Sequence, residues 1–73
     1  MSNSIYSQDH KYLIEQLKKA RKEAGLGQVE IAKKLKKSQS YISKIESGQR
    51  RIDVLQLKQF AKLYKKVLNY FVK

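Results

Sequence analysis

Between Gly27 and Gly48 lie two amphipathic segments, each about two helical turns long. About three residues separate them, too few for the two helices to lie side by side as a long hairpin. The helices are therefore expected to cross at a steep angle. The first begins at about Gln28 and the second near Ser38, a plausible N-cap, and Gly48 ends the second. Their apolar residues recur at helical spacing: Val29, Ile31, Ala32 and Leu35, then Ile42 and Ile45.

Helices are also expected on both sides of this pair. Residues 9–24 carry one apolar stripe, with Asp9 or Ser7 as the cap and Gly25 in the left-handed conformation at the end. A fourth helix starts after Asp53, and a last short helical piece covers about residues 68–72. We therefore expect an all-α, compact five-helix domain over residues 9–73, preceded by a flexible tail at residues 1–8. The outer stripes are Leu13, Leu17, Ala20 and Ala24 in the first helix and Val54, Leu57, Phe60, Ala61 and Tyr64 in the fourth.

The small size of the chain limits its chemistry. At 73 residues it fits one domain, with no room for a core and an enclosed catalytic cleft, so we expect no enzyme. There is no Cys, and a lone His10 with six scattered acids offers no metal-ligand cluster, so no cofactor or metal is expected. The chain has no apolar run of membrane-spanning length and no signal-peptide pattern, which favours the cytoplasm.

Charge indicates the class of partner. The chain has 17 Lys plus Arg against 6 Asp plus Glu, a formal net charge of +11. On so small a surface this excess attracts polyanions, nucleic acid first and anionic lipid second. A cationic surface that only keeps the protein soluble is the alternative reading.

The stretch QVEIAKKLKKSQSYISKIES, from Gln28 to Ser47, resembles the helix-turn-helix of the phage repressor/Cro-like (XRE) family of DNA-binding regulators. The wider run KARKEAGLGQVEIAKKLKKSQSYISKIESGQRRIDV and the closing LNYF extend the resemblance from about Leu13 to Phe71. It implies a repressor-like fold in which Gln28 pairs with Gln39. It also implies a buried ion pair between Arg21 and Glu46, which we read as structural.

The sequence departs from the family pattern at a few positions. Lys36 stands where the family usually has Gly, because the turn needs a left-handed residue there. Gly27 replaces the usual hydroxyl N-cap of the second helix. Lys65 and Lys66 replace a common pair of Gly and an apolar residue. These changes bear on the geometry of the turn and on the stability of the second helix, while Lys36 and Lys37 add charge near the groove.

The third helix is expected to enter the major groove of duplex DNA. Gln39 suits a bidentate contact to adenine, Lys44 suits guanine or phosphate, and Tyr41 suits a thymine methyl or a phosphate. Gln28 and the loop arginines are expected to bind the backbone. The complete set of predicted DNA-binding residues is Gln28, Ser38, Gln39, Ser40, Tyr41, Ser43, Lys44, Arg50 and Arg51.

These observations predict a sequence-specific, double-stranded DNA-binding transcriptional regulator, which we expect to be a repressor. One domain reads few base pairs, so a homodimer is expected through surplus C-terminal residues, which alternatively finish the core. These residues are Leu63, Tyr70, Phe71 and Val72. Two other functions stay open. One is an antitoxin or autoregulator of a toxin-antitoxin or restriction-modification system, which also binds a protein. The other is a cationic protein that coats nucleic acid or acts on membranes without sequence preference.

Overall fold

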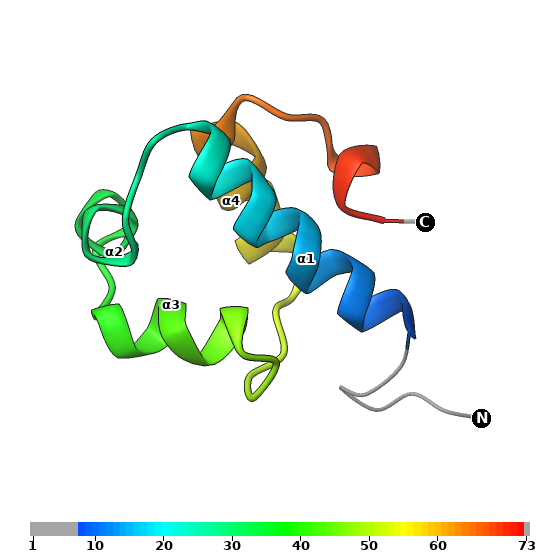
Figure 1. The fold of residues 1–73 in the computed structure, drawn as a ribbon, viewed down its shortest axis with the longest axis horizontal. Coiled ribbons are helices and arrows are strands. Elements are labelled where there is room, and N and C mark those ends of the chain that lie inside the picture. Colours follow the sequence, from blue (N-terminus) through cyan, green and yellow to red (C-terminus); the bar gives the residue numbers. More distant parts are fainter. Residues whose placement is uncertain (1–7, 73) are drawn as a thin grey trace.

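The computed structural model describes residues 8–72, and every regular element within them is a helix (Figure 1). The α-helices are α1 (Gln8–Glu23), α2 (Gln28–Leu35), α3 (Gln39–Glu46) and α4 (Val54–Tyr64). A 3₁₀ helix, η1 (Leu68–Phe71), follows them. Helix α1 begins one residue before its expected start. The proposed cap Ser7 and the rest of the expected tail lie outside the described residues.

The expectation of five helices was wrong in one element, because residues 68–71 form a single 3₁₀ turn. Val67 and Val72, on either side of it, are both extended, and Val67 provides no side-chain cap. The N–H of Tyr70 bonds the carbonyl of Val67 at 3.0 Å, which is the three-residue spacing of a 3₁₀ helix. Four residues are too few to close a second turn of α-helical hydrogen bonds.

Helices α2 and α3 cross steeply, as the short connection requires. Figure 1 views α2 nearly end-on while α3 lies across the picture. Lys36 ends α2 with φ +59°, the left-handed conformation expected where the family usually has Gly. The N–H of Lys37 then bonds the carbonyl of Ala32 at 2.8 Å. Ser38 caps α3, because its Oγ accepts a hydrogen bond from the N–H of Tyr41 at 3.1 Å.

Other helix ends follow local signals in the sequence. Gly25 closes α1 with φ +74°, as expected. The Asp53 carboxylate accepts a hydrogen bond from the N–H of Gln56 at 2.8 Å, which caps α4. At Gly27, which has no side chain to cap α2, the carboxylate of Glu30 instead accepts a hydrogen bond from the Gly27 N–H at 2.6 Å. This contact is the glutamate half of a capping box, and it satisfies the N–H of the cap residue itself.

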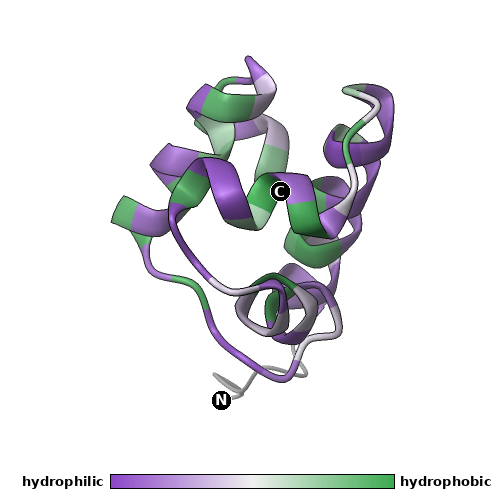
Figure 2. Ribbon diagram, turned by 90° about the vertical axis from the view of Figure 1, so that its left-hand side faces the viewer, coloured by the Kyte–Doolittle hydropathy of each residue, from purple (hydrophilic) through white to green (hydrophobic). Residues whose placement is uncertain are grey.

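The core draws side chains from every helix, and Figure 2 shows hydrophobic and hydrophilic stretches alternating around the helices. Ala32 is buried where α2 meets α3, as its small size allows. The largest fully buried side chains are Leu17, Ile31, Ile42, Ile45, Phe60 and Phe71. Phe71 therefore closes the core, which is one of the two roles left open for it, and none of its surface is available to a partner.

Three expected stripe residues do not enter the core. Ala24 lies just past the end of α1, in a turn, and is exposed. Val29 and Val54 are in the first turns of their helices and are 53% and 61% exposed. In α1, Leu17 and Ala20 are buried as expected, Leu13 is partly buried, and Ile14, which was not expected, is also buried. Among the described residues, no helix combines the length and hydrophobicity needed to cross a bilayer.

Candidate nucleic-acid interface

One face of α3 is polar and the other is buried. Ile42 and Ile45 have no exposed surface. The N-cap Ser38 and the helix residues Gln39, Ser40 and Lys44 are exposed, as expected from the sequence. Ser43 is half-buried, and so is Tyr41, which packs against the core. Helix α3 therefore presents a short row of hydrogen-bonding side chains from a rigid base.

A chain of hydrogen bonds joins this row to the interior. The Nε2 of Gln39 donates to Oε1 of Gln28 at 2.9 Å, so the structure contains the pair that the family resemblance implied. The Nε2 of Gln28 in turn donates to Oε1 of Glu46 at 3.0 Å. Gln28 therefore uses both ends of its amide within the protein, which orients the side chain of Gln39.

Glu46 ends this chain in a buried ion pair with Arg21. The Nε and Nη2 of Arg21 donate to the two carboxylate oxygens at 2.8 and 3.0 Å, and Nη1 donates to the carbonyl of Leu26 at 2.9 Å. The side chains are 13% and 4% exposed. Hydrogen bonding to Glu46 raises the pKa of Arg21 above its usual value. The pair joins α1 to the end of α3, in the structural role that we expected.

Tyr41 does not simply project outward to contact DNA bases. Its hydroxyl accepts a hydrogen bond from the Nε2 of Gln56 on α4. Its ring lies beneath two cations, with the Nζ of Lys37 at 5.2 Å and the Cζ of Arg50 at 4.8 Å from the ring centre. Burial raises the pKa of the Tyr41 hydroxyl, which keeps it neutral. The hydroxyl is therefore engaged inside the protein, and the cations cover the ring.

The two loop arginines point to different parts of the molecule. The backbone N–H of Arg50 bonds the carbonyl of Lys44 at 3.2 Å, so the loop folds back on the last turn of α3. Arg51 acts instead on His10 at the start of α1, where burial and then the charge of Arg51 lower the histidine pKa. Both arginines are exposed. The structure thus groups Arg50 with α3 and brings Arg51 within electrostatic range of His10 on α1.

Gln56 is a site residue that our sequence analysis missed. Its Oε1 accepts a hydrogen bond from the N–H of Asp53 at 3.0 Å, while its Nε2 holds Tyr41. The only available signal was its position three residues after Asp53, which is the capping-box spacing. That spacing indicates a helix start, but it contains no information about a tyrosine on another helix.

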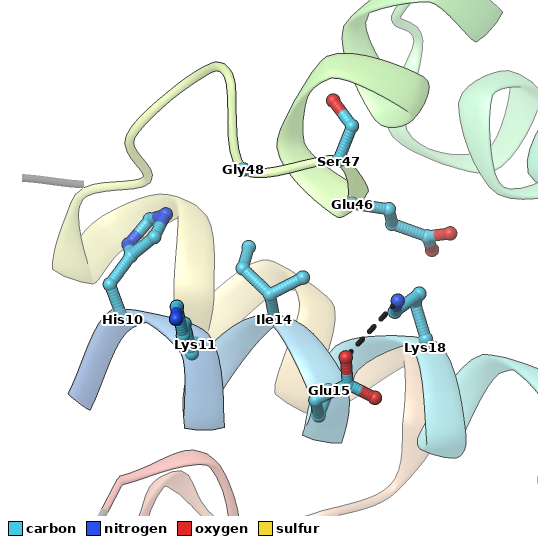
Figure 3. Close-up of a pocket in the computed structure, with 8 residues that line it drawn as sticks. All are labelled: His10, Lys11, Ile14, Glu15, Lys18, Glu46, Ser47 and Gly48. Atoms are coloured by element: carbon cyan, nitrogen blue, oxygen red, sulfur yellow. Dashed lines mark ion pairs between the residues drawn. The ribbon is translucent and has the colours of Figure 1, made fainter. Parts of the chain in front are cut away.

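The structure also has a pocket of about 450 Å³ between α1 and the end of α3 (Figure 3). Glu15 at its rim pairs with Lys18 at 3.3 Å. The other carboxylate lining it, Glu46, is bonded by Arg21 and Gln28. Both carboxylates of the pocket are therefore already engaged within the protein.

Comparison with known proteins agrees with this geometry. The sequence profile of a helix-turn-helix family matches residues 17–71. A search of curated proteins found no match to the chain. Because the profile match covers α2, the turn and α3 together with most of the helices that support them, the chain belongs to the phage repressor/Cro-like (XRE) helix-turn-helix family of DNA-binding transcription regulators.

Proposed function

We propose that the protein is a sequence-specific regulator that reads the major groove of duplex DNA with α3. The observation that carries this proposal is the orientation of Gln39, whose amide donates a hydrogen bond to the side chain of Gln28. That bond uses one amide hydrogen of Gln39, so a second hydrogen and Oε1 remain for a base. One donor and one acceptor on the same amide are what a bidentate contact to N7 and N6 of adenine requires. The exposed Ser40 and Lys44 would contact neighbouring bases or phosphates.

Positively charged residues around α3 would supply the affinity that is independent of sequence. Arg50 and Arg51 are exposed in the loop after α3, and Lys44 lies on α3 itself. The N-terminus of α2, at Gln28, adds free backbone N–H groups for a phosphate. Phosphate contacts set the register of the helix on DNA, and base contacts then give the preference.

A domain seated in the major groove blocks other proteins from the same base pairs, so repression needs no further contact. We therefore propose a non-catalytic repressor that acts on DNA in the cytoplasm, with residues 9–73 as its DNA-binding domain. Occupancy of a promoter-proximal site should lower transcription from a reporter in proportion to the affinity of the site.

We further propose that two copies bind together. Leu63 and Tyr70 are only partly buried, Val72 is about half exposed, and Val67 beside them is 72% exposed. These residues lie near the C-terminal end of the described chain, and we propose that a second copy covers their exposed apolar surface. Sedimentation should show a dimer that Val67→Lys with Val72→Lys converts to a monomer. A monomer that occupies a single half-site would contradict this arrangement.

In vitro selection from random duplexes at physiological salt tests sequence specificity directly. We expect a consensus with two-fold symmetry and half-sites about one helical turn apart. Recovery of no consensus, together with binding that disappears at moderate salt, would favour a protein that coats nucleic acid without specificity.

Variants then separate base contacts from phosphate contacts. Gln39→Ala should reduce the preference at one position of each half-site by about 1 to 3 kcal/mol, and Gln59→Ala, an exposed glutamine of α4, is its control. Arg50→Ala should instead weaken binding to all duplexes and lower the slope of log K against log salt by roughly one. Lys22→Ala, an exposed cation of α1, is the matched control for that charge. The opposite pattern would refute the assigned roles.

A further inference from the structure

The Tyr41 ring brings together two cations from opposite ends of α3. Lys37 belongs to the turn before the helix, and Arg50 belongs to the loop after it. Both nevertheless lie over one ring, with Nζ and Cζ at 5.2 and 4.8 Å from its centre. Attraction between a cation and the face of an aromatic ring is significant at this range. We call the three residues Lys37, Tyr41 and Arg50 the Tyr41 cluster.

Both the backbone and the ring of Tyr41 are held in place. The N–H of Tyr41 donates to Oγ of Ser38 at the start of α3, and its hydroxyl accepts from Gln56 on α4. Gln56 is fixed in turn by the N–H of Asp53. The inner part of the ring packs against the hydrophobic core. A side chain with so many restraints can restrict more mobile side chains that rest on it.

The charges of the cluster are not neutralised by an ion pair. The three ion pairs among residues 8–72 involve Lys18, Arg21 and Lys66, so neither Lys37 nor Arg50 takes part in one. Asp53 is near enough to influence Tyr41, but its carboxylate accepts a hydrogen bond from the N–H of Gln56. Both cations lie close to the same ring without a carboxylate partner, so their charges are available to an anion such as a phosphate.

We propose that Tyr41 is a positioning residue, which holds Lys37 and Arg50 in place to bind phosphates beside α3 and does not itself read a base. The inference rests on the proposed binding of DNA and adds Lys37 and Gln56 to the residues that serve it. Long cationic side chains lose conformational freedom when they bind a phosphate. The ring imposes part of that restriction before DNA arrives, so less affinity is lost on binding.

The free protein provides the first test. In an NMR spectrum of the wild-type chain, the side-chain methylene protons of Lys37 and Arg50 should be shifted by the ring current of Tyr41. Tyr41→Phe keeps the ring and should keep these shifts, whereas Tyr41→Leu should remove them. Arg51, which does not lie over this ring, is the internal control. Unshifted methylenes in the wild-type protein would overturn the proposal without any variant.

A double-mutant cycle on DNA provides the second test. We expect Tyr41→Leu alone to weaken binding about fivefold and Arg50→Ala alone about tenfold, on specific and random duplexes alike. The double variant should fall well short of the roughly 50-fold loss that independent effects would give. Tyr41→Leu combined with Arg51→Ala should show independent effects. Thermal denaturation verifies that each variant is folded.

The outcomes separate this inference from the proposed function. Independent effects of Tyr41→Leu and Arg50→Ala, or a changed base preference in Tyr41→Leu, would refute the role of Tyr41 while DNA binding stands. Failure of the wild-type chain to bind any duplex would instead refute the proposed function, and the phosphate-binding role with it. If Tyr41→Leu does not fold, Tyr41→Phe is measured instead. Because it keeps the ring, it should bind DNA like the wild-type chain and leave the effect of Arg50→Ala at about tenfold, whereas a severalfold loss in Tyr41→Phe would refute the role of the ring.

Discussion

Glu46→Gln tests how much the buried ion pair stabilises the fold. Glutamine has nearly the shape of glutamate but no charge, so Arg21 would be left as a poorly solvated cation with no counterion. The Glu46 carboxylate accepts three hydrogen bonds and is 4% exposed. Breaking a buried pair by removing one partner costs about 3 to 5 kcal/mol. We expect about 3 kcal/mol, at the lower end of that range, because the glutamine Oε1 can still accept the two bonds that now end on Oε1.

That loss is large for this chain. Native domains have about 0.05 to 0.15 kcal/mol of stability per residue, which for 73 residues gives a total of roughly 4 to 11 kcal/mol. A loss of about 3 kcal/mol should lower the midpoint of thermal unfolding by roughly 12 to 24 °C, measured by circular dichroism of the helices. Glu15→Gln, which breaks the exposed pair with Lys18, is the control and should change stability by less than about 0.5 kcal/mol. Equal midpoints for the two variants would refute the reasoning.

Two further changes test local features of the fold. Lys65 ends α4 with φ +60°, so Lys65→Gly should stabilise the protein by about 0.5 to 1 kcal/mol in urea unfolding, and a loss of stability would contradict this. The buried hydroxyl of Tyr64 has no hydrogen-bond partner among the described residues, so Tyr64→Phe should leave stability unchanged or raise it by up to about 1 kcal/mol at pH 7. Burial also raises the pKa of Tyr64 in the folded state above the ordinary 10. The folded state therefore favours the neutral form, and its stability should fall as the pH rises above about 10. Tyr64→Phe should show a smaller decrease between pH 9 and pH 11, and an identical decrease would mean that Tyr64 does not contribute.

The ends of the helices were predictable because their signals are local. Ser38 and Asp53 each cap the helix that follows, and Gly25 adopts the left-handed conformation that α1 needs at its end. The left-handed Lys36 was expected only from the family resemblance, since nothing in a lysine favours that conformation. The same resemblance implied the pairing of Arg21 with Glu46, which lie 25 residues apart and which helical spacing alone does not connect.

Burial of apolar residues was harder to predict from the sequence in the first turn of a helix than near its centre. Ile42 and Ile45 are buried as expected, but Val54 and Val29, in the first turns of α4 and α2, face away from the core. An apolar side chain permits burial and does not require it. Which first-turn positions are covered depends on how the neighbouring helices are placed, and that placement is a property of the whole fold.

The candidate site shows the same limit in more detail. The family resemblance implied that Gln28 meets Gln39, but it did not reveal that Gln28 also bonds Glu46, whose carboxylate binds Arg21. A single amide therefore links the proposed base-reading residue to the ion pair that holds α1 against α3. Gln28 orients Gln39, and Glu46 orients Gln28. The position of the proposed base-contacting side chain and the stability of the core therefore depend on the same carboxylate. Neither property can be changed at Glu46 without affecting the other.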